Sequence, residues 1–195
     1  MPTAAVTRKA SAKRRKAPKP AAPRLSHTRR PVQLDAADWQ TALRRQFGAE
    51  QNFELHNLGS EPVYSEFAVH NPRSRTRWRV AIRGAAPGQN FCSCPDFATN
   101  ELGTCKHIEF TLAKLAARRG GKAALRRGFQ PTYSEVWLDY AGARQVRFRA
   151  GSSCPPALLQ QALQRCVLVA CGLGEGAEQE GLTSPRRDPG GELFL

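Results

Sequence analysis

The chain contains 195 residues, of which 41% are hydrophobic, and it carries a formal net charge of +14 at pH 7. This length suits one domain with appendages, and the hydrophobic fraction supports a modest core. No apolar run approaches the roughly 18 residues of a membrane span, and the N-terminus lacks the apolar core of a signal peptide. We therefore expect neither a membrane protein nor a secreted one, and predict a cytoplasmic location, with nucleoid association as one form of it.

The positive charge is concentrated at the N-terminus. Residues 1–30 hold ten Lys and Arg and no acidic residue, whereas the remaining 165 residues hold twenty basic and sixteen acidic ones. Prolines and a scarcity of apolar side chains predict a disordered basic arm over residues 1–33. Such an arm attracts nucleic acid by neutralising phosphates and releasing counterions. The alternative is a solubilising extension.

The main domain is predicted over residues 34–130, and it begins with a helix. Asp35 suits the N-cap position and Gly48 suits the end of the helix. Apolar residues recur at intervals of four between them, which predicts one core-facing stripe. The stripe consists of Trp39, Leu43 and Phe47.

Three strands are predicted next, over 53–58, 63–70 and 75–83, because apolar and polar residues alternate there. The core-facing side of the third strand holds Trp78, Val80 and Ile82. Its other side holds Arg73, Arg75, Arg77, Arg79 and Arg83. A face of arginines could contact phosphates. The alternative is the ordinary solvated face of an antiparallel sheet.

A metal-ligand pattern follows within residues 91–115, where C-x-C is followed ten residues later by C-x-H. The four residues are Cys92, Cys94, Cys105 and His107. Thiolate and imidazole are the ligands of tetrahedral structural zinc sites. Residues two apart on a strand face the same side, so the first pair can reach one ion. Residues two apart in a helix diverge, so the second pair converges only if Cys105 lies in the turn and His107 opens the helix.

The predicted geometry is thus a strand, a loop and a helix with one structural Zn²⁺ at the joint. Pro95 would stop the strand, and Thr104 would cap the helix. The buried stripe of that helix would contain Ile108, Leu112 and Leu115. Two alternatives are cysteines that pack as small hydrophobes and a disulfide or redox pair.

The segment C-S-C-P-D-F, a variable loop and C-K-H-I resembles the SWIM zinc finger, whose pattern is C-x-C followed by C-x-H. That family occurs in Mutator-type transposases, in Swi/Snf-type helicases, and in bacterial proteins beside or fused to such helicases. With its preceding hairpin, the motif covers about a quarter of the chain. The resemblance implies a zinc-stabilised ββα module that binds DNA or protein, with a Swi/Snf-type helicase as a partner.

Further cations follow the motif. Arg118 and Arg119 are expected in the last turn of the motif's helix, which Gly120 and Gly121 would terminate. With Lys106 and the five strand arginines, they are the candidate nucleic-acid contacts. Additional positive charge comes from Lys122, Arg126 and Arg127.

A hairpin and a helix are predicted over 131–171, followed by a disordered tail over 172–195 that is rich in Gly, Glu and Pro. Across the hairpin, Val136, Leu138 and Tyr140 would face Val146, Phe148 and Ala150. The helix would begin at Pro155-Pro156 and carry Leu159, Leu163 and Cys166 on one face. The remaining thiols, on Cys154, Cys166 and Cys171, are expected to pack or to be incidental.

The predicted fold class is therefore α+β, with a small zinc-stabilised antiparallel hairpin and helix, a flanking N-terminal helix and a second hairpin. No Walker A, H-E-x-x-H or G-x-S-x-G motif is present, and four protein ligands would leave zinc no position for an activated water. An enzyme is not expected. Two hypotheses remain: a nucleic-acid-binding module, with DNA expected, that serves a helicase-like or recombination machine, and a protein-interaction module that docks on a helicase or ATPase.

Overall fold

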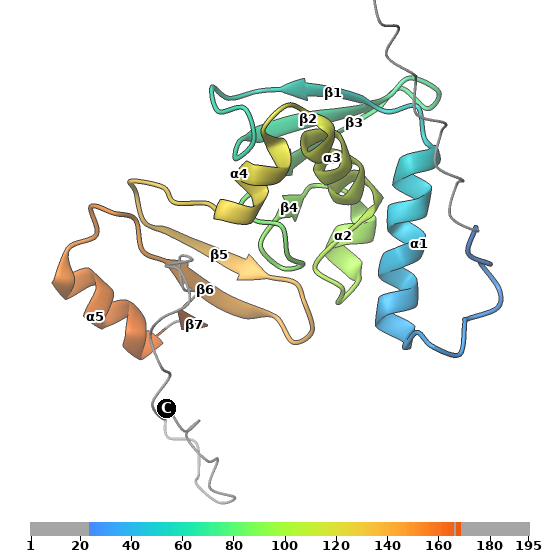
Figure 1. Cartoon of the computed structure of the whole chain (residues 1–195). Coiled ribbons are helices and arrows are strands. Elements are labelled where there is room, and N and C mark those ends of the chain that lie inside the picture. The colour runs from blue at the N-terminus through green and yellow to red at the C-terminus, as the bar shows by residue number, and fades with distance from the viewer. Residues whose placement is uncertain (1–23, 166, 169–195) are drawn as a thin grey trace, which may run out of the picture.

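The structure is a computed structural model that describes residues 24–165 and 167–168, and it confirms the mixed α+β class (Figure 1). The predictions for residues 1–23 and 169–195, and for Cys166 and Cys171, lie outside the described residues. The helices are α1 (Ala36–Glu50), α2 (Pro95–Thr99), α3 (Lys106–Ala117), α4 (Gly121–Arg127) and α5 (Pro156–Arg165). The strands are β1 (Glu54–Asn57), β2 (Glu66–Asn71), β3 (Thr76–Ala81), β4 (Phe91–Cys92), β5 (Glu135–Asp139), β6 (Gln145–Arg149) and β7 (Val167–Leu168).

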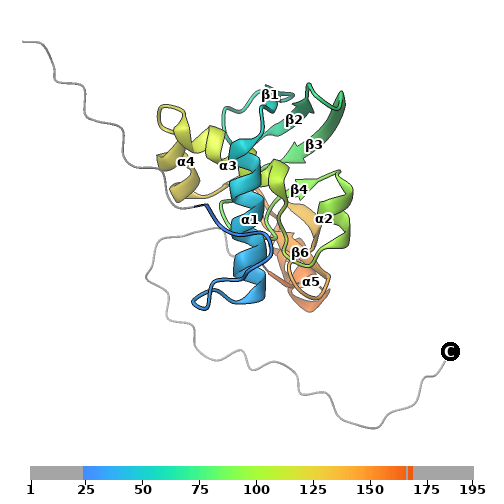
Figure 2. The ribbon, with the colours of Figure 1, turned by 90° about the vertical axis from the view of Figure 1, so that its right-hand side faces the viewer.

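The first sheet has the antiparallel order β1-β2-β3-β4. Its register places Phe67 opposite Val80, and Val80 opposite Cys92, so these buried side chains share one face. Helix α3 packs on this face, and α1 packs against α3 on the side away from the sheet (Figures 1 and 2). The core of the domain therefore lies between the sheet and α3, next to the C-x-C segment.

Helix α1 begins as predicted but ends later. The Asp35 carboxylate accepts a hydrogen bond from the Asp38 N–H at 2.7 Å, which confirms the N-cap. Gly48 was predicted to end the helix, yet it lies inside it and is buried. A Cβ at this position would lie 2.6 Å from the carbonyl oxygen of Lys106. Glycine is thus required there by the close approach of α1 to α3, not by a helix end.

The predicted core stripe of α1 is only partly correct. Leu43 is buried, but Phe47 is exposed. Trp39 is half-buried, and its indole N–H donates to the carbonyl of Ser26 at 3.2 Å. The segment 24–33, predicted as part of a disordered arm, instead runs beside α1, where Gln46 makes hydrogen bonds to the Leu25 backbone. The predicted stripe of α1 therefore packs partly against the segment 24–33 and partly against α3.

The predicted arginine strand is shorter than expected. Strand β3 covers Thr76–Ala81, so Arg73 and Arg75 lie in the turn before it, and Arg75 has a φ of 56°. Arg77 and Arg79 do share the outer face of β3. The prediction of five arginines on one strand face was therefore wrong, because the N-P-R-S-R turn extends further than the alternation of arginines suggested.

The second sheet has the order β5-β6-β7. The predicted hairpin is confirmed, with Val136 opposite Phe148 and Leu138 opposite Val146. Strand β7 pairs in parallel with β6 and was not predicted. The predicted face of α5 is only partly correct: Leu159 is half-buried and Ala162 is buried, but Leu163 is exposed.

The β5–β6 hairpin is fastened to the loop that separates the two halves of the C-x-C…C-x-H motif. The ring of Tyr140 lies 4.8 Å from that of Phe97 in α2. The Gly142 N–H donates to the Glu101 carbonyl at 2.7 Å. The Trp137 indole N–H donates to the Gly88 carbonyl at 3.0 Å. The second sheet therefore supports the loop before β4 and the loop after α2.

Candidate metal centre

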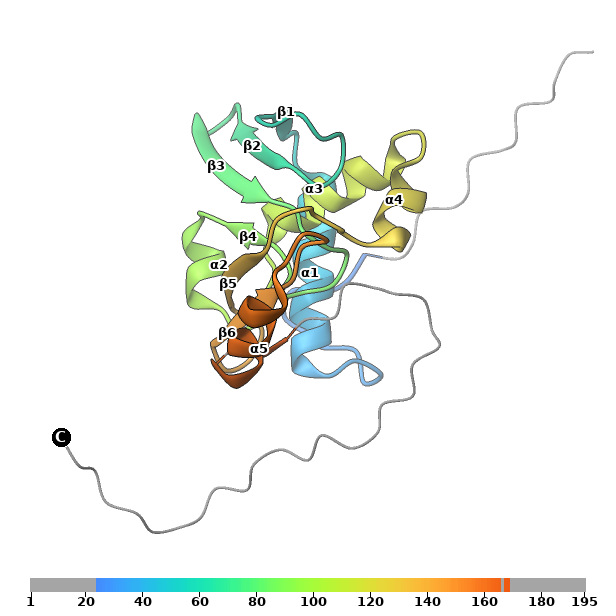
Figure 3. The same cartoon turned by 90° about the vertical axis from the view of Figure 1, so that its left-hand side faces the viewer.

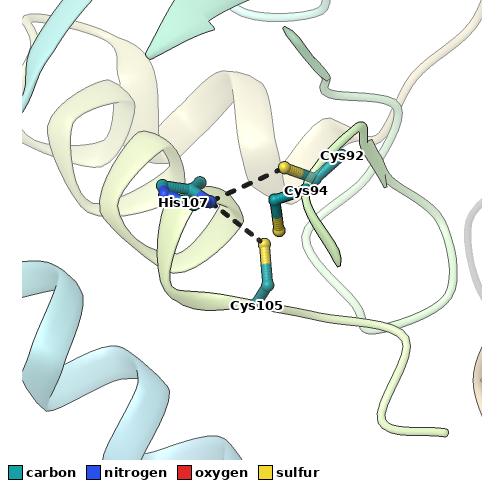
Figure 4. A group of neighbouring side chains, drawn as sticks. All are labelled: Cys92, Cys94, Cys105 and His107. Atoms are coloured by element: carbon teal, nitrogen blue, oxygen red, sulfur yellow. Dashed lines mark hydrogen bonds between the residues drawn. The ribbon is translucent and has the colours of Figure 1, made fainter. Parts of the chain in front are cut away.

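The structure brings the four predicted ligands together in one buried cluster (Figure 4). Cys92 ends β4, Cys94 is the N-cap of α2, Cys105 is the N-cap of α3, and His107 lies in the first turn of α3. Their donor atoms all lie within 4.8 Å of one another. Four buried donors from three elements are placed to hold one metal ion.

The spacing of the donor atoms suits a four-coordinate ion. The Nδ1 atom of His107 lies 3.8 Å from the Cys92 sulfur and 4.0 Å from the Cys105 sulfur. A tetrahedral zinc site with ordinary bond lengths puts nitrogen and sulfur about 3.5 Å apart and two sulfurs about 3.8 Å apart. The two nitrogen–sulfur distances need to shorten by only a few tenths of an ångström around an ion, and Nδ1 is the imidazole atom that faces the thiols.

The first pair of ligands converges by a route that differs from the prediction. The strand ends at Cys92, although the next N–H, that of Ser93, still donates to the Arg79 carbonyl at 2.9 Å. The chain then turns into α2, with Pro95 at its start, where a variable loop was expected. The Cys94 sulfur caps this short helix by accepting from the Phe97 N–H at 3.4 Å.

The second pair converges as predicted, except for the cap. Cys105, not Thr104, is the N-cap of α3, so it lies in the turn while His107 is already helical. The hydroxyl of Thr104 has another role, since it donates to Glu109 at 2.9 Å. The offset between an extended residue and the first helical turn directs both side chains toward the Cys92 and Cys94 thiols (Figure 4).

Two ion pairs from α1 hold the two halves of the cluster, and sequence reasoning missed both. Arg44 makes two hydrogen bonds to Asp96, at 2.7 and 3.2 Å, in the helix that Cys94 caps. Arg45 donates to Glu109 at 2.9 Å, in the helix that carries His107. Each acid lies two residues after a ligand. That spacing was visible in the sequence, but the partner helix was not.

Aromatic rings close the side of the cluster around the imidazole. The His107 ring lies 5.2 Å from that of Phe53 and 6.0 Å from that of Trp78. Phe53 in turn contacts Phe110 edge to face at 5.3 Å. These rings exclude water from the imidazole. The position of His107 is therefore fixed by ring packing as well as by its contacts with the Cys92 and Cys105 thiols.

The crowding of three thiols perturbs their acidity. Hydrogen bonding with Cys105 and Cys94, together with burial, raises the pKa of the Cys92 thiol above its ordinary value. Hydrogen bonds from the Cys105 and Cys92 thiols hold the pKa of Cys94 below its ordinary value. Burial raises the pKa of Cys105 to about 12. Because thiolates are the metal ligands, metal binding would displace protons from this cluster.

The cluster does not contain a disulfide, since the cysteines at 92, 94 and 105 are free. Three sulfurs and one nitrogen would fill a tetrahedral coordination sphere, so the arrangement suits a structural metal and not one that activates water. No other group of three or more metal-binding side chains occurs among the residues the structure describes.

The candidate nucleic-acid contacts do not form one surface. Within the described residues, Arg73, Arg75 and Arg77 are exposed and have no acidic partner. By contrast, Arg79 is paired with Glu66, and the largely buried Arg83 lies near both Glu66 and Glu135. The two ion-paired arginines are thus partly neutralised.

The other predicted contacts lie elsewhere. Arg118 and Arg119 follow the end of α3 instead of forming its last turn, since α3 ends at Ala117. They lead into α4, which was not predicted and which lies on a different side of the domain from the β2–β3 turn (Figures 1 and 3). Lys106 lies near the metal cluster, with its ammonium 5.7 Å from the Phe47 ring centroid.

None of the helices in the described part of the chain combines the length and the apolar character that crossing a bilayer requires. Comparison with known protein families, with curated proteins and with solved structures finds no match for this chain.

Proposed function

We propose that the protein is a zinc-stabilised module of the SWIM type that binds nucleic acid without catalysing a reaction. The four-donor cluster at the joint of β4, α2 and α3 is the observation that carries the zinc assignment. Three sulfurs and an imidazole nitrogen form a set that zinc prefers over hard cations such as Mg²⁺. In this proposal the ion fixes the relative position of the sheet and α3 and takes no part in chemistry.

The nucleic-acid proposal rests on exposed arginines that lack acidic partners. Arg73, Arg75 and Arg77 gather at the β2–β3 turn and the start of β3, where no ion pair within the described residues neutralises them. Their strand continues into the β3–β4 pair that carries Cys92. Zinc would thus hold the strand that presents the cations, which could contact phosphates whatever the base sequence. DNA is the ligand that the SWIM resemblance implies.

A protein-interaction role is the second candidate, and one observation favours it. The β5–β6 hairpin exposes three apolar side chains on one face, those of Val136, Leu138 and Val146. Exposed apolar patches of this kind can mark protein contacts. A helicase or another ATPase, or a recombination protein, is the partner class proposed for this face, and it could act together with nucleic-acid binding.

The zinc proposal is tested by metal analysis of purified protein and of two variants, Cys94→Ser and His107→Ala. We expect one zinc per chain in the wild type, and loss of metal with loosening of the region around α2 and α3 in both variants, because a structural metal is coupled to folding. Ser153→Ala, an exposed change outside the cluster, is the control. A wild type without stoichiometric zinc would refute the assignment.

The nucleic-acid proposal is tested by the salt dependence of duplex DNA binding. Replacing Arg73, Arg75 and Arg77 by Gln should weaken binding to all sequences alike and reduce the slope of log K against log salt by about 0.9 for each phosphate that the variant no longer neutralises. Deleting residues 2–23 removes seven Lys and Arg and tests the arm separately. Unchanged DNA affinity in the triple variant, together with a co-purifying protein that stays bound after nuclease treatment, would favour the protein-interaction role.

A further inference from the structure

A cavity of about 730 Å³ lies beside α4, at the end of α3 opposite to the metal ligands. Its walls come from the loop between β1 and β2, the end of α4, and the connector 128–133 that leads to β5 (Figure 3). None of the predicted site residues lines it. The cavity is therefore separate from both the metal centre and the arginines of β3.

Three aromatic rings follow one another along this cavity. The Tyr64 hydroxyl donates to the carbonyl of Ala124 at 3.0 Å, which ties the β1–β2 loop to α4. Its ring lies 5.1 Å from that of Phe129, which in turn lies 6.5 Å from that of Tyr133. Tyr133 is 53% exposed, so its ring offers free surface to a ligand.

The middle ring of the three, that of Phe129, lies against two charged side chains. The guanidinium groups of Arg83 and Arg149 lie 5.3 and 5.2 Å from the centroid of the Phe129 ring. Both arginines pair with Glu135 of β5. The aromatic row is thus built on an ion-pair network, so a flat ligand would meet a surface that needs little rearrangement.

Two cations lie at the cavity, in a stretch of chain that is rich in positive charge. Five cations and no acidic residue occur between positions 118 and 127, and none of the five has an acidic partner among the described residues. Arg127 lines the cavity directly, and Arg118 donates to the Pro62 carbonyl on its wall at 3.4 Å. Glu61 is the single carboxylate on the lining.

We propose that this aromatic cavity binds single-stranded nucleic acid, with a base stacked on Tyr133 and the backbone held by Arg118 and Arg127. Exposed aromatic rings next to a basic groove are the chemistry that binds unpaired bases, since every base has a π-face whereas a duplex hides those faces within its stack. A proline-rich peptide could use the aromatic rings, but it would leave the cations without partners. The inference rests on the proposed nucleic-acid function and specifies the strand state for this site.

The experiment compares a fluorescein-labelled oligo(dT) single strand of about ten nucleotides with a duplex of similar length. The full chain is used as wild type, Tyr133→Ala, Tyr133→Phe, and the exposed control Val32→Ala. We expect Tyr133→Ala to weaken single-strand binding about tenfold and duplex binding little. Tyr133→Phe keeps the ring and should bind as the wild type does. Thermal unfolding of each variant checks that this exposed change leaves the fold intact.

The outcomes separate this inference from the function on which it rests. A wild type that binds neither probe would overturn both. A wild type that binds both probes, with Tyr133→Ala weakening neither or weakening both equally, would overturn only the stacking site. Displacement of the single strand by a polyproline peptide in a Tyr133-dependent manner, with tighter binding of the peptide, would assign the cavity to peptides and refute the inference.

Discussion

The ion pair between Arg45 and Glu109 should contribute more to stability than the exposure of Arg45 on α1 suggests. The Glu109 carboxylate is 6% exposed, and it accepts from Arg45 Nε at 2.9 Å and from the Thr104 hydroxyl at 2.9 Å. Arg45→Met keeps most of the length of the side chain but removes the charge. The buried carboxylate would then retain a single hydroxyl donor.

The size of the effect follows from the unequal burial of the two partners. A surface ion pair contributes about 0–1 kcal/mol, whereas breaking a fully buried one costs about 3–5 kcal/mol. Arg45 is 66% exposed, so solvent screens part of the attraction, but the donor that the variant removes is charged and its acceptor lies in the core. We expect a cost of about 2 kcal/mol, within the range for hydrogen bonds to charged groups.

The neighbouring pair provides a matched control. Arg44 also bonds an acid beside a metal ligand, but Asp96 is considerably more exposed than Glu109. Arg44→Met should therefore cost less than about 1 kcal/mol. Glu109→Gln in the Arg45→Met background removes the stranded charge, so the double variant should be more stable than the sum of the single changes predicts.

The assay is denaturant unfolding of each variant with metal bound, together with the rate at which a chelator removes the metal. Arg45→Met should release metal faster than Arg44→Met. Glu109 lies in α3 two residues after the ligand His107, and it accepts a hydrogen bond from Thr104, the residue before the ligand Cys105. Equal and small stability losses for both arginine variants, with no recovery in the double variant, would refute the argument that the buried carboxylate determines the cost.

Three further predictions concern the packing around the cluster and in the second sheet, and all are measured by the same unfolding assay. Gly48→Ala should destabilise the protein by about 1 kcal/mol. The added Cβ would clash with the backbone of α3 at a cost of about 1–3 kcal/mol, which exceeds the gain in helix propensity of about 1 kcal/mol. A variant at least as stable as the wild type would contradict the close approach of the two helices. Trp78→Ala should cost about 3 kcal/mol and loosen the imidazole of His107, since the ring is half-buried against it; a loss below about 1 kcal/mol would place the ring outside the core. Glu135→Gln should cost roughly 3 kcal/mol, because it leaves Arg149, which is 2% exposed, without its carboxylate; an unchanged stability would show that the rings of Trp137 and Phe129 suffice to hold the guanidinium.

The metal cluster could be predicted because its signal is local. Cysteine and histidine spacing restricts which side chains can converge, and the requirement that Cys105 precede the helix followed from helical periodicity alone. The strand and hairpin registers were similarly within reach, because period-two alternation determines which residues share a face. These predictions needed no knowledge of what lies on the other side of the element.

The errors arose where a residue serves a distant partner. Gly48 suits a helix end, yet it is needed where α1 crosses α3. Arg83 continues the alternation of the strand arginines, yet it pairs with Glu135, far along the chain in the second sheet. Sequence pattern describes the environment that an element provides for itself, and it carries no information about which remote carboxylate or backbone will approach.

That distinction also bears on how the domain presents its cations. Two arginines that continue the regular alternation in the sequence are ion-paired: Arg79 with Glu66 inside the first sheet, and Arg83 with Glu135 in the second sheet. Among the described residues, Arg73 and Arg75 in the turn before β3 and Arg126 and Arg127 at the end of α4 have no acidic partner, and neither does Arg77 inside β3. A turn or a helix end has fewer neighbours than a strand in a sheet, so its charges remain available to a ligand. We therefore expect the exposed cations without acidic partners to be the ones that contact a ligand and the ion-paired arginines to be structural, and the variants proposed above test the two groups separately.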